Sequence, residues 1–354
     1  MVQRILERGE IESLDHTAFP RLRLPPPDAG SVFSPRAARL RRLAAGEVPG
    51  IPVNPALSGY LTLMMEVVAA QAETLAALDA SGIALPDHAA MELAQQHAMP
   101  PLAAFAPRSP AWRGILATLL DKLDIVAEKQ VELAAVIAGL RVLDADAVEE
   151  LADAVIAQRI DGLNAAQAPF IAAALQVLWT YHASRLPPQL VPVLETGTLC
   201  PVCGSHPVAS VIRIGGQSQG YRYLQCGLCS SEWHMVRVKC SCCEQNGKIA
   251  YQGLGSLDAD DAVAAPVNKA NDPRKFARAE TCDDCHGYHK IFNQEHDYDV
   301  EPLADDLASL TLDVLVSEAG YSRASINPLL WFGDIAPESA PESTPESASE
   351  SAPE

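Results

Sequence analysis

The chain has 354 residues, 48% of them hydrophobic, and a formal net charge of −19. This length allows two or three ordinary domains. The acidic balance argues against general nucleic-acid binding, because phosphate contacts need clustered Lys and Arg. Charged residues such as Glu66 and Glu73 interrupt the longest apolar run, so no membrane insertion is expected.

The N-terminal stretch "MVQRILERGEIESLD" contains neither the apolar segment of a secretory signal nor a twin arginine, so the cytoplasm is the expected location. Residues 1–30 are expected to be irregular. A helix should then begin at Ser34 and Pro35 and end before Gly46. We expect the basic face of this helix to lie in solvent; it carries Arg36, Arg39, Arg41 and Arg42.

Residues 31–190 are rich in Ala and Leu at helical spacing and predict an α-helical domain of five to seven helices. The clearest helical stretches are 57–80, 111–139, 144–158 and 168–184. Nothing in this half pairs a nucleophile with a base or gathers carboxylates at ligand spacing. Residues 191–199 are interpreted as a linker.

After residue 200 the apolar period changes from helical spacing to alternation, which predicts strands. The strand candidates are "VASVIRI", "YRYLQC", "EWHMVRVKC", "GKIAY", "RAETC" and "YHKIFNQ", with a loop at 255–277 and a helix at 301–319. The fold class is therefore α+β, with a cysteine-rich module at 200–336. The tail 337–354 has five Glu and no basic residue and is expected to be disordered.

All nine cysteines lie between residues 200 and 285, and eight of them form four Cys-x-x-Cys pairs. Thiols stay reduced in the cytosol, so metal binding is favoured over disulfides. Two such pairs can enclose one tetrahedral ion when a hairpin brings them together. The chain order predicts a first site of Cys200, Cys203, Cys226 and Cys229, and a second of Cys240, Cys243, Cys282 and Cys285.

Several features of these sites can be read from the neighbouring residues. Gly204 and Gly227 suit tight turns, and the strand "EWHMVRVK" should join the two sites in a tandem ribbon. Cations close in sequence could offset the negative charge of the thiolates; they are Arg213, Arg222, Arg237, Lys239, Lys248 and Lys290. Nearby histidines are expected in surface or packing roles; they are His206, His234, His286, His289 and His296.

The residues leave some alternatives open. Four thiolates suit zinc or a single iron equally, and such closed sites usually hold a fold together and do not catalyse. A thiol-redox role is disfavoured, because none of the pairs opens a helix after a strand. Residues 200–290 hold ten Lys or Arg and nine Asp or Glu, too even a balance for a nucleic-acid surface. Cys242 is a bystander thiol or an alternative ligand.

The amino-acid sequence around these cysteines closely resembles that of one protein family. "CPVCG", "CGLC", "CSCC", "ETCDDCHGYHKI" and "ADDLASLTLDVLVSEAGYSRASINPLL" are similar to the FdhE family of formate dehydrogenase accessory proteins, as is "QAPFIAAALQVLW" in the helical half. The match is dense over 200–254 and 278–330 and looser elsewhere. Cys242 stands where other members typically have a different residue. No chemistry is assigned to "DDLASL".

The resemblance implies a cytoplasmic, non-enzymatic assembly factor for respiratory formate dehydrogenase. It implies that the protein binds the catalytic subunit of that enzyme before export. It also implies rubredoxin-like iron sites at the eight paired cysteines, with zinc as the alternative. The runner-up function is a thiol-redox or one-electron transfer module acting on the same client. The sequence leaves a homo-oligomer open.

Overall fold

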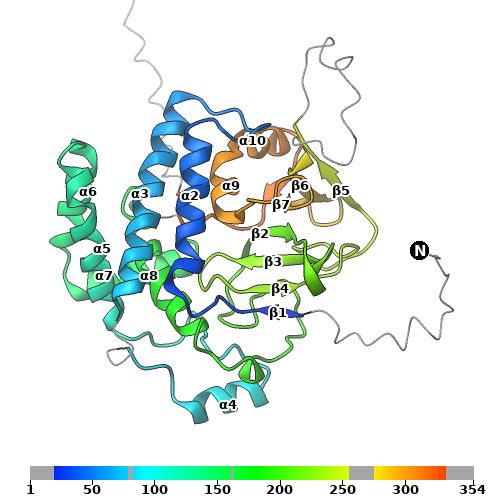
Figure 1. Cartoon of the computed structure of the whole chain (residues 1–354). Coiled ribbons are helices and arrows are strands. Elements are labelled where there is room, and N and C mark those ends of the chain that lie inside the picture. Colours follow the sequence, from blue (N-terminus) through cyan, green and yellow to red (C-terminus); the bar gives the residue numbers. More distant parts are fainter. Residues whose placement is uncertain (1–19, 79–82, 160, 162, 255–274, 332–354) are drawn as a thin grey trace, which may run out of the picture.

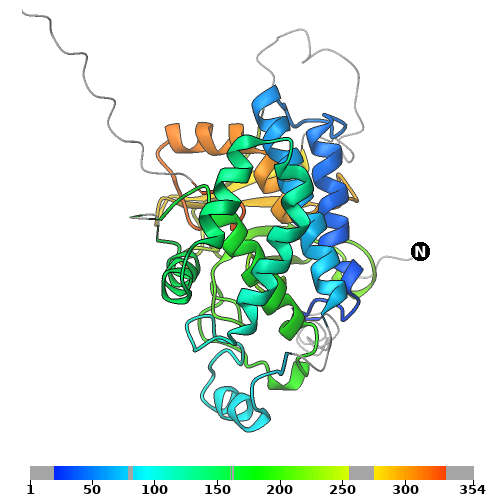
Figure 2. The ribbon, with the colours of Figure 1, turned by 90° about the vertical axis from the view of Figure 1, so that its left-hand side faces the viewer.

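The computed structural model describes residues 20–331 except 79–82, 160, 162 and 255–274. Helices form a layer against one face of a mixed β-sheet (Figures 1 and 2), which confirms the α+β class. Three parts of the predictions lie outside the described residues: 1–19, most of the 255–277 loop, and the 337–354 tail. Within the described part, no helix has both the length and the apolarity to cross a bilayer.

The helical layer follows the sequence pattern with two differences. Its members are α2 (Phe33–Ala44), α3 (Pro55–Ala77), α4 (His88–Gln96), α5 (Ala111–Ala127), α6 (Val131–Arg141), α7 (Ala145–Ile156) and α8 (Ala168–Ala183). The single helix expected over 111–139 breaks at Gln130, whose backbone is extended. The chain then folds back, so that Leu123 and Ile137 are both buried. Helix α4 was missed because Met91 is its one buried residue.

Helix α8 is the centre of the helical layer. All of its residues are buried, as expected for a helix that is apolar on every side. It packs against α3, α5 and α7. Its Gln176 side chain bonds to both halves of the protein: Gln71 of α3 donates to Gln176 over 2.9 Å, and Gln176 donates to the carbonyl of Gly227 over 2.6 Å. Helix α8 therefore connects the helical layer to the cysteine-rich half.

The sheet is continuous across both predicted metal sites. Its strands are β1 (Leu22–Arg23), β2 (Pro207–Ile212), β3 (Arg222–Cys226), β4 (Glu232–His234), β5 (Ile249–Gln252), β6 (Ala277–Cys282), β7 (Gly287–Asn293) and β8 (Ser322–Arg323). The order is β1-β4-β3-β2-β7-β6-β5, and β8 also pairs with β7. Every pairing is antiparallel except β2 with β7 and β7 with β8.

The connection between the two halves of the sheet differs from the expectation. Strand β4 ends at His234, so "EWHMVRVK" is not a continuous strand joining the sites. The junction is instead the parallel pairing of β2 with β7, in which Ser210 lies opposite Ile291. At the far edge, β1 from the N-terminal segment pairs with β4.

The helix expected over 301–319 is two helices, α9 (Pro302–Ala308) and α10 (Leu310–Glu318), separated at Ser309. Two adjacent carboxylates of α9, Asp305 and Asp306, are fully buried. Asp305 accepts a 2.8 Å hydrogen bond from Nε of Arg39 in α2. Asp306 forms ion pairs with Lys290 of β7 and Arg323 of β8. Helix α9 thus links α2 to the sheet.

The prediction that the arginines of α2 are solvated is wrong for two of them. Arg36 and Arg39 are buried, with exposures of 1% and 2%. Arg36 donates to Glu301 over 2.9 Å, and Arg39 forms ion pairs with Asp297 and Asp305. All three carboxylates come from a segment more than 250 positions further along the chain, which no helical periodicity can detect.

The electrostatics of the two carboxylates differ. Burial raises the pKa of Asp305 to about 7, although the charge of Arg39 opposes that shift. Burial also acts to raise the pKa of Asp306, but Arg323 and Lys290 outweigh it and hold that pKa below its usual value. Asp306 is therefore ionised in the folded protein, between two cations.

Replacing Asp306 with Ala should destabilise the protein strongly, because Lys290 and Arg323 would keep their charges and only Asp313 would be left to pair with both. We expect a loss of about 3–5 kcal/mol in the free energy of unfolding, measured by urea denaturation. The loss should persist from neutral to mildly acidic pH and shrink only as pH falls through the lowered pKa of Asp306. Asp121→Ala is the control: its carboxylate is 72% exposed, so the change should cost less than about 1 kcal/mol. Equal losses for the two variants would contradict this assignment.

Candidate metal centres

The four Cys-x-x-Cys turns share one backbone conformation. The residue after each second cysteine has a positive φ: Gly204 (77°), Ser230 (60°), Glu244 (61°) and His286 (53°). Three of these are not glycine, although the left-handed region disfavours other residues. In three turns the first cysteine N–H also donates to the carbonyl five residues on, at Ser205, Ser231 and Gln245. The repeated geometry indicates four copies of one metal-binding turn.

The two glycines singled out from the sequence serve different purposes. Gly204 has the left-handed backbone that the turn requires. Gly227 does not; a Cβ atom there would lie 3.0 Å from Cγ of Pro328. Gly227 lies in the predicted turn, but its backbone does not require a glycine, and close packing of the 326–330 segment explains the glycine instead.

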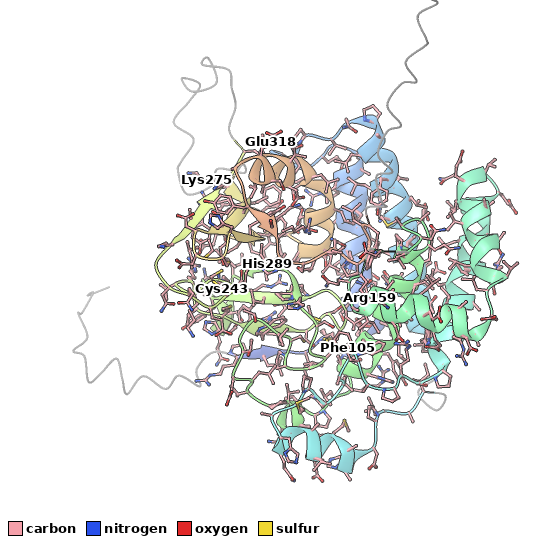
Figure 3. All side chains as sticks on the ribbon, turned by 180° about the vertical axis from the view of Figure 1, so that it is seen from behind. Phe105, Arg159, Cys243, Lys275, His289 and Glu318 are labelled. Atoms are coloured by element: carbon pink, nitrogen blue, oxygen red, sulfur yellow. The ribbon has the colours of Figure 1, made fainter. Side chains whose placement is uncertain are left out.

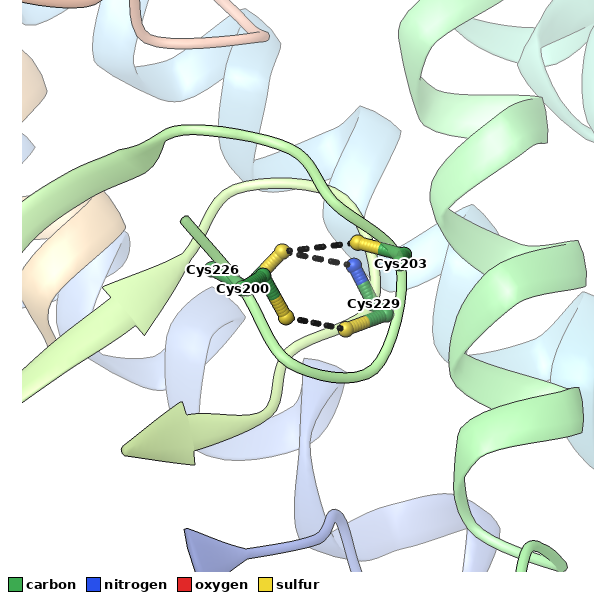
Figure 4. Close-up of side chains that lie close together, drawn as sticks. All are labelled: Cys200, Cys203, Cys226 and Cys229. Atoms are coloured by element: carbon green, nitrogen blue, oxygen red, sulfur yellow. Dashed lines mark hydrogen bonds between the residues drawn. The ribbon is translucent and has the colours of Figure 1, made fainter. Parts of the chain in front are cut away.

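The first four-cysteine group is enclosed by the protein (Figure 4). Its Sγ atoms lie within 4.8 Å of one another, and all four cysteines are fully buried. Cys200 Sγ lies 3.6 Å from Cys229 Sγ, and Cys203 Sγ lies 3.4 Å from Cys226 Sγ. The backbone N–H groups of Leu228 and Cys229 each donate to Cys226 Sγ over 3.4 Å. Such donors stabilise a thiolate.

The helical layer holds both turns of the first group in place. Leu102 N donates to the carbonyl of Val202 over 2.9 Å, and Ala104 N donates to that of Cys203 over 2.8 Å. On the other turn, Thr180 Oγ1 lies 3.1 Å from Ser230 Oγ. Sequence reasoning missed these contacts, because they join residues from different elements. They make the first group part of the junction between helices and sheet.

The ionisation of the first group fits a bound cation. Burial raises the pKa of the Cys200 and Cys229 thiols well above the usual value, with further contributions from neighbouring sulfurs. Burial acts the same way on Cys203, but hydrogen bonds from the neighbouring cysteines outweigh it and lower that pKa. Four thiolates can therefore coexist here only with a compensating positive charge. A divalent ion of zinc or iron supplies it in tetrahedral sulfur sites.

The second four-cysteine group lies nearer the surface. Its Sγ atoms also fall within 4.8 Å of one another. Cys240 Sγ is 3.9 Å from Cys285 Sγ, and Cys243 Sγ is 3.9 Å from Cys282 Sγ. Cys240 and Cys282 are buried, Cys243 is half-buried and Cys285 is exposed. The structure thus brings all eight predicted cysteines into the two predicted groups; metal ligation by them stays a prediction.

The cations expected to offset the thiolate charge pair with carboxylates instead. The ion pairs are Arg213 with Glu232, Arg222 with Glu280, Lys239 with Glu244, Lys248 with Asp284 and Lys290 with Asp306. The remaining cation, Arg237, donates to the carbonyl of Gly220. Nearness in sequence to the cysteines therefore did not predict which groups these cations pair with. Backbone N–H groups are the donors that contact the sulfurs directly.

Comparison with known proteins agrees with this geometry. Three FdhE sequence profiles match the chain: "FdhE, N-terminal" over residues 19–195, "FdhE, central domain" over 199–237 and "FdhE, C-terminal domain" over 238–330. The chain belongs to the FdhE family. It is 36% identical over 337 residues to Protein FdhE of Escherichia coli K12, covering 93% of this chain and 95% of that one. A homologue from Pectobacterium carotovorum is 38% identical over the same length, covering 93% of this chain and 97% of that one.

A solved FdhE structure has the same fold. The crystal structure of the FdhE protein from Pseudomonas aeruginosa matches with a TM-score of 0.75 and 37% identity, covering 89% of this chain and all of that one. The profiles of the FdhE family divide the cysteine-rich half between Arg237 and Val238, so each part carries one four-cysteine group. The domain boundaries drawn from the sequence stay a prediction.

The ninth cysteine of this FdhE-family chain lies beside the second group and outside it. Cys242 Sγ is 3.5 Å from Nδ1 of His289, which also lies 3.1 Å from Ser241 Oγ. Figure 3 places Cys243 and His289 in the same sheet half of the molecule. Across the described residues, neither Cys242 nor any histidine or carboxylate joins the two clusters. This position favours the bystander interpretation of Cys242.

Cys226→Ser should remove the metal of the first site, because a hydroxyl replaces one of four thiolate ligands. Metal analysis should fall from about two ions per chain to about one, and the free energy of unfolding should fall with it. Cys242→Ser is the matched control, with the same atomic change one residue from a ligand. It should keep both metals and full stability. Loss of metal from the control would show that the ligand set is wrong.

The two sites should also release metal at different rates, because the second group has an exposed and a half-buried cysteine and the first has none. A chelator added to the reduced, metal-loaded protein should give two release phases. Cys285→Ser should remove the fast phase, and Cys226→Ser should remove the slow one. A single phase in the wild type, or the opposite assignment of phases, would contradict the difference in burial.

Proposed function

We propose that this protein is an accessory factor for formate dehydrogenase maturation and not an enzyme. Membership of the FdhE family supports the formate dehydrogenase assignment. The observation that supports the absence of catalysis is that each centre has a complete set of four sulfur ligands. Four cysteines surround each site, and a tetrahedral ion bound by four thiolates has no position left for a substrate.

The proposed client is the catalytic subunit of formate dehydrogenase, bound in the cytoplasm before export. Helices and sheet together would form the docking surface. The contacts of Leu102 and Ala104 with the Cys200–Cys203 turn, and of Gln176 and Thr180 with the Cys226–Cys229 turn, support this arrangement. An ion in the first site fixes these turns, and through them the relative position of the two layers. Metal loss should therefore weaken client binding as well as stability.

Maturation in a strain that lacks its own FdhE protein tests this function. The wild-type chain should restore formate dehydrogenase activity and should co-purify with the catalytic subunit under reducing conditions. Cys226→Ser should lose both readouts, whereas Cys242→Ser should keep both. Restored activity without any co-purification would contradict the docking proposal. Co-purification of the wild type with no effect on activity would contradict the maturation proposal.

The second candidate function is one-electron or thiol-redox transfer to the same client. The exposure of Cys285 favours it, because an electron or a thiol could reach the second site from the surface. We propose iron at both sites, with zinc as the alternative, and the metal distinguishes the two functions. Zinc-loaded protein should support maturation if the sites are structural. If only iron-loaded protein works, and its iron titrates reversibly, the redox function is correct.

A further inference from the structure

A turn at residues 236–239 lies on the surface between the two predicted metal centres. It follows β4, which ends at His234, and precedes Cys240 of the second group. Two of its side chains are apolar and exposed, Val236 by 44% and Val238 by 69%, and the exposed Arg237 stands between them. Single exposed apolar side chains are ordinary, whereas a group of them is typical of a binding surface.

A buried arginine holds the backbone of this turn. Arg222 of β3 is 0% exposed and donates to the carbonyls of Val236 and Lys239 over 3.0 Å and 2.9 Å. The same guanidinium pairs with Glu280 of β6. Glu280 in turn accepts from Ser241 Oγ over 3.0 Å, in a turn of the second four-cysteine group. Since a buried ion pair adds little net stability by itself, its main consequence here is a fixed conformation for a turn whose side chains face solvent.

A small basic pocket lies beside the turn. Its volume is about 280 Å³, and Arg237 and Tyr251 form part of its wall. Lys275 and Arg278 add further positive charge, and no carboxylate of the described residues lines it. Arg237 is exposed and donates to the uncharged carbonyl of Gly220, and Arg278 is half-buried. Neither arginine pairs with a carboxylate in the part of the chain that the structure describes, so this is a locally positive region on a chain of net charge −19.

The pocket and the turn lie on the sheet face that points away from α9. Side chains of a strand alternate between the two faces. Lys290 of β7 pairs with Asp306 of α9, so the next residue, Ile291, points to the opposite face, where it lines the pocket. Arg278 is the register partner of Ile291 and points the same way. We use the name docking patch for the pocket cations and the exposed apolar side chains around them: Arg237, Lys275, Arg278, Tyr221, Val236, Val238 and Tyr251.

The chemistry of the docking patch fits a segment of another protein. Tyr and Arg are enriched at the energetic centres of protein interfaces, and a turn that is already fixed loses little conformational entropy on binding. The basic pocket matches a carboxylate side chain, and the exposed valines and tyrosines match apolar side chains next to it. A second copy of this chain fits poorly, because a two-fold contact through the patch would bring two basic pockets together.

We propose that the docking patch binds a segment of the client in which a carboxylate side chain lies between apolar ones. The carboxylate enters the pocket beside Arg237 and Arg278, and the apolar side chains pack on Val236, Val238 and Tyr251. This inference rests on the proposed function, because the client is the catalytic subunit of formate dehydrogenase. It adds where the client docks and which kind of segment is recognised.

Binding of the full-length, metal-loaded protein to the purified catalytic subunit tests the location, measured by surface plasmon resonance under reducing conditions. Val238→Asp should weaken binding by at least about tenfold, as at an interface hot spot, because it places a carboxylate beside that of the client. Val131→Asp is the matched control and should bind like the wild type. Val131 is 80% exposed and begins α6, on the opposite side of the molecule from β5 (Figure 1).

Both variants should keep the metal content and the thermal stability of the wild type, since both positions are exposed. Equal affinities of Val238→Asp and Val131→Asp would overturn the docking patch and leave the proposed function standing. Absence of binding by the wild type would overturn the proposed function, and this inference with it. A wild-type homodimer in sedimentation that Val238→Asp dissociates would overturn the client as occupant in favour of a second copy.

The charge of the pocket has its own test in the association rate. Arg237→Gln should slow association with the catalytic subunit and reduce its dependence on salt, because exposed charges act mainly on the rate of encounter. Arg41→Gln is the control and should change neither quantity, since Arg41 is exposed on α2 and does not line the pocket. An unchanged rate and salt dependence in Arg237→Gln would overturn the carboxylate in the pocket.

Discussion

The packing of this protein depends on two adjacent buried carboxylates in α9. Asp305 points to the helical layer and pairs with Arg39, while Asp306 points to the sheet and pairs with Lys290 and Arg323. Neighbouring residues on a helix face different directions, so a single turn of α9 contacts both layers. Since an unpaired buried charge is expensive, these pairs fix how the layers can pack. The "DDLASL" stretch, to which the sequence assigned no chemistry, therefore acquires a structural role.

The same spacing of cysteines produces two different environments. Each group uses two Cys-x-x-Cys turns with a left-handed residue after the second cysteine. The first group is fully buried between the sheet and α8, whereas Cys285 of the second group is exposed. Local sequence specifies the turn, but the surrounding elements specify access to it. Solvent therefore reaches the second group through Cys285, whereas the first group is closed to it.

Polar interactions over long sequence separations recur where the layers meet. Arg36 and Arg39 reach the 297–305 segment, Gln176 reaches Gly227, and β2 pairs in parallel with β7. Their common consequence is that the N-terminal, central and C-terminal segments form one packed body.

The sequence by itself determined the α+β class, most of the helices and strands, and the grouping of eight cysteines into two sets. Those features depend on short-range periodicity and on Cys-x-x-Cys spacing, which are local properties of the chain. The tertiary structure alone decided the burial of Arg36 and Arg39, the parallel β2–β7 junction, the partners of the cations near the cysteines and the exclusion of Cys242 from the second cluster. Each of these features depends on contacts between segments that are distant in the sequence. The free energy of such contacts depends on which polar and charged groups become buried next to one another when the layers pack.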